Sequence, residues 1–204
     1  MSTTQSPRSG TRGRIVEVAL ELFSEQGYQE TSLREIADRL GVTKAALYYH
    51  FKTKDDIVHG IIEQAAAPID EVIAWGEGKP WTPGLRDELI RRFAAGAADR
   101  APLLRFFHEN QPALRDSSAG LEFKERMVSM IKLVHGPEAG PEDRLRAAMA
   151  LFSFHTALFL LKQDLAAGPE AACATGTVTS LAQATEAALV VALEIAERIE
   201  PPRA

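Results

Sequence analysis

The spacing of apolar residues predicts a helical chain. Between about Thr11 and Gln26 these residues recur every three or four positions, as on the buried stripe of a helix, and Gly27 follows as a helix terminator. No alternation of apolar and polar residues extends beyond a few positions, so we predict an all-α fold. Pro68 is expected to interrupt the fourth helix. The same criteria predict helices at about 33–40, 43–49, 53–67 with an extension toward residue 75, 84–98, 102–109, 119–135, 142–165 and 177–199, about nine in all.

Residues 31–54 fit two short helices joined by a tight turn. Ser32 and Glu35 have the spacing of a capping box at the start of the first helix, and Gly41 ends it with a residue that accepts positive φ. Thr43 is placed to cap the second helix. This is the helix-turn-helix pattern, in which the second helix enters the major groove of DNA. The segment therefore predicts a DNA-binding regulator.

A longer pattern surrounds this segment. It comprises Ala19–Phe23, Gly27, Thr31-Ser32, Ile36-Ala37, Leu40–Val42 and the string Leu-Tyr-Tyr-His-Phe-Lys-Thr-Lys at 47–54. With these residues, Ile15 to Ile61 resembles the N-terminal domain of the TetR family of bacterial repressors. The resemblance implies a three-helix DNA-binding domain at about 11–54 and a helical domain for ligand binding and dimerisation at about 55–204. Residues 1–10 are expected to form a flexible arm.

The distribution of charge agrees with this division. Residues 1–54 contain eight Lys and Arg against six Asp and Glu, whereas residues 55–204 contain fifteen against twenty-two. The net charge of −5 therefore conceals a basic N-terminal segment, as expected of a part that binds DNA. Arg12 and Arg14, beside the first helix, are candidates for phosphate contact.

Three residue types in the predicted recognition helix suit contacts with bases. Lys44, on its first turn, can donate to guanine O6 and N7. Ala45 and Ala46 are small, which lets the backbone approach the groove and offers a methyl contact to thymine. Tyr48, one turn after Lys44, is expected to face the groove. The alternative is that one of the two tyrosines, Tyr48 or Tyr49, serves mainly in packing.

Other polar residues are placed to contact the DNA backbone. Ser32 and Thr43 stand at helix starts, where a hydroxyl and free amides suit a phosphate. Tyr49, His50 and Lys54 are also assigned to phosphate, and the resemblance to the TetR family implies the same. A bond within the fold is the alternative for His50, and a solvated charge is the alternative for Lys54.

Two helices in the C-terminal part are expected to form a subunit interface. The helix at 142–165 is apolar nearly all round its middle, so it needs cover on every side. The last helix, at 177–199, has a broad stripe of small apolar residues. Together they suit a two-fold four-helix interface in a homodimer, and a palindromic operator would match that symmetry. The alternative is a monomer in which the apolar helix is fully internal.

Aromatic and methionine side chains crowd the middle helices, and an apolar cavity with a few polar anchors is the usual small-molecule site. His155, amid an apolar helix, is the sharpest candidate for a polar anchor. Each of the apolar residues could equally be ordinary core. The candidates for a ligand pocket are Phe106, Phe107, Phe123, Met127, Met130, Phe152, His155 and Phe159.

No catalytic residues, metal or cofactor are expected, and the protein is not expected to be an enzyme. The five histidines show no metal-ligand spacing, and the sequence contains no Gly-x-Ser-x-Gly or nucleotide loop. Cys173, the single cysteine, excludes an intrachain disulfide. The polar start, Met1 to Gly13, is not expected to be a signal peptide, and the apolar run Ala147–Leu161 is expected to be too short to span a bilayer. We therefore expect a cytoplasmic protein without a membrane partner.

These observations together predict a transcriptional repressor that a small, largely apolar effector releases from a double-stranded, palindromic DNA operator. Two alternatives keep the same fold. One is an activator, and the other is an adaptor controlled by a protein partner.

Overall fold

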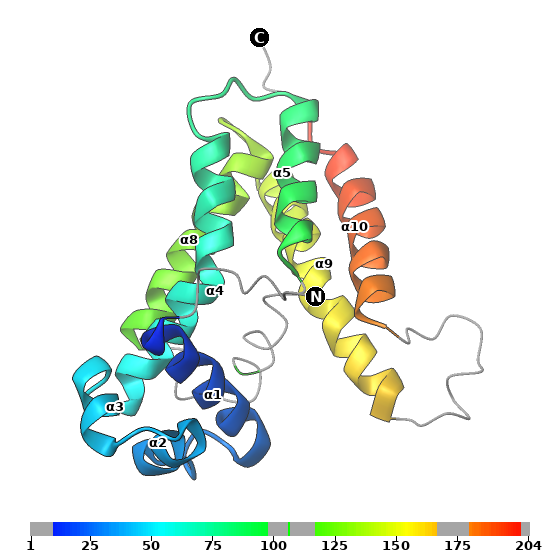
Figure 1. The fold of residues 1–204 in the computed structure, drawn as a ribbon. Coiled ribbons are helices and arrows are strands. Elements are labelled where there is room, and N and C mark those ends of the chain that lie inside the picture. The colour runs from blue at the N-terminus through cyan, green and yellow to red at the C-terminus, as the bar shows by residue number, and fades with distance from the viewer. Residues whose placement is uncertain (1–9, 98–105, 107–116, 167–179, 201–204) are drawn as a thin grey trace, which may run out of the picture. The chain divides into compact units, whose positions relative to one another are not determined.

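The computed structural model describes residues 10–97, Phe106, 117–166 and 180–200. These residues form helices and no strand, which confirms the all-α prediction (Figure 1). The predicted helix at 102–109, apart from Phe106, and the predicted arm, apart from Gly10, lie outside the described residues. The helices are α1 (Thr11–Gln26), α2 (Leu33–Leu40), α3 (Lys44–His50), α4 (Lys54–Gly76), α5 (Pro83–Ala95), α8 (Ser118–His135), α9 (Pro141–Ala166) and α10 (Leu181–Glu197).

The local capping signals have the predicted effect. The Ser32 hydroxyl accepts from the Glu35 amide at 3.2 Å, while the Glu35 carboxylate accepts from the Ser32 amide at 2.7 Å. Gly41 ends α2 with φ of 69°, in the left-handed region that favours glycine. The Thr43 hydroxyl accepts from the Ala46 amide at 3.2 Å and so begins α3. Both helices of the predicted helix-turn-helix are confirmed.

The described chain divides into two compact units. The first unit comprises Met1–Ala65 and Pro102–Phe123, and the second comprises Ala66–Ala101 and Lys124–Ala204. Helices α4 and α8 contribute residues to both, because each passes a boundary between the units. The division predicted at residue 54 assigns the beginning of α4 to the second domain, whereas here it belongs to the first unit. Pro68 lies within α4, which is continuous from Lys54 to Gly76.

Aromatic rings form the centre of the first unit. Phe23 stacks on Phe106 at 5.5 Å between ring centroids and meets Tyr28 edge-to-face at 5.2 Å. Leu47 and Phe51 are fully buried in the same core. Their burial holds α3 against the rest of the unit, since apolar side chains removed from water stabilise the packed state.

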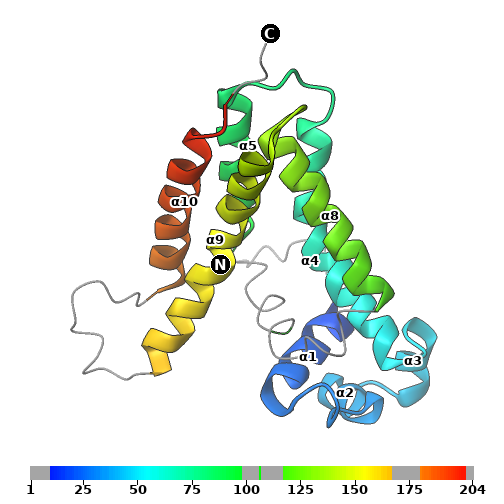
Figure 2. The same ribbon diagram turned by 180° about the vertical axis from the view of Figure 1, so that it is seen from behind.

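In the second unit, α10 packs along α9 through a row of alanines, and both views of the ribbon show the two helices side by side (Figures 1 and 2). The Ser153 hydroxyl on α9 donates to the Ala188 carbonyl at 3.1 Å. Arg86 on α5 is buried, pairs with Asp87 at 2.7 Å and donates to the Ile199 carbonyl at 3.3 Å. The alanines, at every fourth position, are Ala184, Ala188, Ala192 and Ala196.

Helix α9 is longer than its most apolar run, Ala147–Leu161, because residues at both ends of that run continue the helix. Its segment Pro141–Asp164, of 24 residues, is long and apolar enough to cross a membrane by length and composition. Only 28% of that segment's most apolar window is buried.

Gly136, between α8 and α9, provides a test of the second unit's packing. Its φ is 75°, and a Cβ built there would lie 2.6–2.7 Å from three atoms of the Trp81 indole. We expect Gly136→Ala to lower the free energy of unfolding by at least about 2 kcal/mol, since backbone strain and overpacking both contribute. Gly84→Ala is the matched control, because its Cβ would meet nothing closer than 3.9 Å. Denaturant titrations in which the two variants unfold alike would contradict this account.

Candidate nucleic-acid interface

The outer face of α3 presents polar and small side chains to solvent. Thr43, Lys44, Ala45 and Ala46 are exposed, and Tyr49 is the most exposed of the large hydrophobic residues described, at 81%. The inner face is Leu47, which is fully buried. A two-turn helix with donors on one side and an apolar anchor on the other has the form needed to enter a groove.

The two tyrosines of α3 have different surroundings. Tyr48 is half-buried and packs against the core of the first unit, and its ring centroid lies 5.3 Å from the Lys44 ammonium. Tyr49 is exposed, and its ring meets that of His50 edge-to-face at 5.2 Å. Tyr48 therefore combines packing with contact to Lys44, whereas Tyr49 and its hydroxyl are available to a ligand.

Ser32 begins α2, but its polar groups already have partners. Its hydroxyl accepts from Glu35, and its amide donates to the Glu35 carboxylate. The hydrogen bonds with Ser32 hold the pKa of the Glu35 carboxyl below its usual value, so the carboxylate is charged at neutral pH. An incoming phosphate at this helix start would have to compete with that carboxylate.

Lys54 lies in a place that the sequence does not reveal. Its ammonium donates to the backbone carbonyls of Tyr28 at 2.8 Å and of Gln29 at 3.0 Å, and it lies 4.6 Å from the centroid of the Tyr28 ring. Asp55 accepts a hydrogen bond from the Tyr28 hydroxyl, and burial together with Asp55 raises the pKa of that hydroxyl. Two of the three N–H bonds of Lys54 thus join the start of α4 to the connection between α1 and α2.

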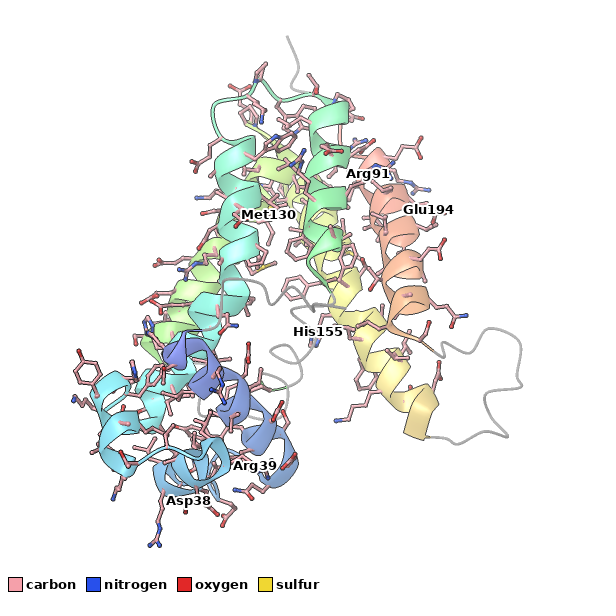
Figure 3. The ribbon with its side chains drawn as sticks, viewed as in Figure 1. Asp38, Arg39, Arg91, Met130, His155 and Glu194 are labelled. Carbon is pink, nitrogen blue, oxygen red and sulfur yellow. The ribbon has the colours of Figure 1, made fainter. Side chains whose placement is uncertain are left out.

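The arginines near the start of α1 also differ. Arg12 pairs with Glu63 on α4 at 3.4 Å, and its guanidinium lies 4.6 Å from the centroid of the Phe51 ring. Arg14 is exposed. On α2, Arg39 pairs with Glu25 at 3.1 Å (Figure 3). Arg14 is therefore the better placed of the two N-terminal candidates for a phosphate.

Comparison with known proteins places this segment in a family. Residues 15–61 match the family model described as "Bacterial regulatory proteins, tetR family". The chain is 46% identical over 69 residues to the HTH-type transcriptional regulator AcrR of Shigella flexneri, covering 34% of this chain and 32% of AcrR. It is 35% identical over 75 residues to the HTH-type transcriptional repressor KstR2 of Rhodococcus jostii, covering 35% of this chain and 37% of that repressor. Residues 15–61 are therefore similar to the N-terminal segment of the TetR family.

The chain as a whole is similar to known structures in fold. A TetR-family regulator from Marinobacter aquaeolei superposes with a TM-score of 0.65 over 95% of this chain and 93% of that one, at 21% identity. At this sequence identity, the similarity shows the fold alone. In sequence, the chain spans about a third of the length of the curated relatives it matches.

The TetR family consists of regulators, which agrees with the prediction that the chain is not an enzyme. Among the described residues, no group of three His, Cys, Asp or Glu side chains is arranged to hold a metal ion.

The predicted ligand-pocket residues fall in both units of the chain. Phe106 is fully buried in the first unit, where it contacts Phe23 and Tyr28, and Phe123 packs against the same core. Phe107 lies outside the described residues. Phe106 thus occupies the position of a core residue.

The remaining candidates lie in the second unit. Met130 is buried on α8, and Met127 is half-buried three residues before it. On α9, Phe152 and Phe159 are exposed, whereas His155 is half-buried and projects on the side away from α10 (Figure 3). A shared pocket for this set stays a prediction.

Lys44 and Lys54 are a matched pair for separating recognition from stability. We expect Lys44→Ala to leave the free energy of unfolding unchanged and to remove about 1–3 kcal/mol of discrimination between bases. Lys54→Ala should lower the free energy of unfolding by about 1–2 kcal/mol, because two carbonyls lose a charged donor, and should weaken binding to all DNA sequences similarly. Denaturant titrations and binding to DNA sites that differ at single base pairs check both. Equal stability and equal discrimination in the two variants would refute the assignment.

Proposed function

We propose that this chain is a transcriptional repressor that binds double-stranded, palindromic operator DNA as a homodimer in the cytoplasm and is released by a small, largely apolar effector. The observation that supports it most directly is the exposed face of α3, where Lys44 and Tyr49 stand over the buried anchor Leu47. The match of residues 15–61 to a family of bacterial regulatory proteins supports the same activity.

In this proposal, α3 enters the major groove and Lys44 donates to a base. The alanines beside Lys44 present no side chain large enough to hold the helix away from the base edges. Tyr49, His50 and Thr43 contact phosphates, which fix the register of the protein on the duplex without reading its sequence. Ser32 and Lys54 already have partners within the fold, so they contribute less to affinity than the exposed side chains of α3.

The proposed homodimer is supported by apolar side chains on the surface of the second unit. The first four on α9 lie three, four or seven positions apart, as on one face of a helix, and the fifth directly follows the fourth. Phe152, at their centre, is 55% exposed. Contiguous exposed patches of this kind are uncommon on monomers and mark interaction surfaces. These residues are Leu145, Met149, Phe152, Phe159 and Leu160 on α9, with Val190 and Val191 on α10.

A second copy of this chain is a better occupant of that face than a membrane. Helix α9 is packed against α10 along its other side, and its ends contain charged residues, Glu142 and Asp143 at the start and Lys162 and Asp164 near the end. A spanning helix would have to bring α10 and these charges to the bilayer. Two copies related by a two-fold axis bury the apolar face in both subunits at once.

Release by an effector requires that binding in the second unit alter the affinity of the first unit for DNA. Helix α4 supplies a continuous connection, since it begins four residues after α3 and continues into the second unit. A compound that favours one position of α4 would alter operator affinity, and operator would alter the affinity for the compound by the same factor.

Selection of binding sites from random duplex DNA by the purified chain tests the proposed operator. We expect enrichment of a palindrome whose half-sites are separated by about one helical turn or a multiple of it, because each subunit presents one recognition helix. A Lys44→Ala, Tyr49→Ala double variant is the control and should enrich no sequence. Failure of the parent chain to enrich any sequence would overturn the proposed function.

The dimer surface is tested by Phe152→Glu. A charge at the centre of a desolvated interface is unfavourable, so the dimer dissociation constant should rise about tenfold or more. Operator affinity should fall with it. Val128→Glu, at an exposed apolar position of α8, is the matched control. Sedimentation velocity over a concentration series measures the effect. Equal dissociation of the two variants would exclude this face as the interface.

A further inference from the structure

We infer that the second unit contains a binding site for a small arylcarboxylate, in a pocket at the C-terminal end of α4. The pocket has a volume of about 460 Å³ and lies wholly within the second unit. Small-molecule sites commonly have volumes of about 300–1,000 Å³. Its apolar walls are Ile73 of α4, Trp81, Leu85 of α5 and Leu133 of α8, each half-buried.

The wall formed by Trp81 is fixed by its neighbours. The indole Nε1 donates to the Val134 carbonyl at 3.2 Å, and the ring lies against Gly136, where a Cβ would overlap it. The ring is therefore held in place before a ligand arrives. A preformed wall lowers the entropic cost of binding, since fewer side chains must be ordered.

The rim of the pocket is positive. It includes two ammonium groups, Lys79 and Lys132, and one carboxylate, Glu77, for a formal charge of +1 on a chain whose net charge is −5. Lys79 has partners already, because it lies 3.5 Å from the centroid of the Trp75 ring and donates to the Trp75 carbonyl. The Lys132 carbonyl accepts from the Gly136 amide at 3.0 Å, whereas within the described part of the chain the Lys132 ammonium has no ion pair or hydrogen bond.

Lys132 and Ser129 together suit a carboxylate. They are three residues apart on α8, so their side chains are neighbours on the helix surface, and both are exposed at the rim. An ammonium and a hydroxyl donate to a group that only accepts, and charge-assisted bonds of this kind are stronger than neutral ones. A neutral acceptor would gain less from Lys132 than a carboxylate does, and a cation would be repelled by it.

The remainder of the ligand is expected to be a flat ring. Trp81 and Pro137 line the pocket next to the polar rim, and aromatic rings pack favourably against such surfaces. The pocket is separate from the predicted ligand set, since none of Met127, Met130, Phe152, His155 and Phe159 lines it. The site goes beyond the proposed function, because its occupancy does not depend on DNA.

Fluorescence of Trp81 tests the site in the full chain. The chain has two tryptophans, so Trp75→Phe leaves Trp81 alone and keeps an aromatic ring beside Lys79. Titration with 3-phenylpropanoate at neutral pH should change the fluorescence saturably. Lys132→Met should weaken binding about tenfold or more, and Ser129→Ala should weaken it less. Replacing the probe by 3-phenylpropan-1-ol should weaken binding to a similar extent as Lys132→Met.

Lys124→Met is the matched control, because Lys124 is exposed on the same helix and does not line the pocket. Its affinity for the probe should equal that of the parent. The inference is overturned if the parent shows no saturable change, if Lys124→Met and Lys132→Met lose affinity equally, or if the alcohol binds as tightly as the carboxylate. If a substituted chain fails to fold, the comparison of the two probes on the parent decides. No outcome bears on the proposed DNA binding, because no DNA is present.

Discussion

The proposed recognition helix, α3, depends on apolar packing, because it is too short to be stable alone. α3 has seven residues, and isolated helices shorter than about 12–15 residues are marginal in water. Leu47 and Phe51 are buried in the core of the first unit, and they hold in place a backbone whose opposite face displays Lys44 and Tyr49. The polar side chains of the proposed interface are thus held in place by buried side chains on the opposite side of the helix.

The contact between α9 and α10 uses small residues, whereas the centre of the first unit is formed by aromatic rings. The alanine row of α10 brings its backbone close to α9, and the Ser153 hydroxyl adds a bond across the contact. That contact covers only one side of α9. The pattern of a helix apolar on all sides therefore has two causes, an internal neighbour on one side and the proposed subunit contact on the other.

Much of the fold was predictable because its signals are local. The capping residues Ser32 and Thr43 bond to amides three residues away, and Gly41 acts through its own φ. Lys54 was not predictable in the same way, since its carbonyl partners are 25 and 26 residues distant in sequence. Phe106 is an aromatic residue of the kind that lines apolar pockets, and only the tertiary structure places it in the core of the first unit. Sequence periodicity cannot specify such contacts, because they depend on how helices are brought together.

The hydrogen bonds of Lys54 link the position of α4 to the local stability of the connection between α1 and α2. Lys54 is the first residue of α4, and it covers the carbonyls of Tyr28 and Gln29 where α1 passes to α2. A displacement of α4 that withdraws the ammonium leaves that connection without its donor and lowers its local stability against opening. For the proposed function, control can therefore proceed by partial unfolding of the first unit, in which an ordered and a frayed α1–α2 connection are the two states, with no rigid rotation required.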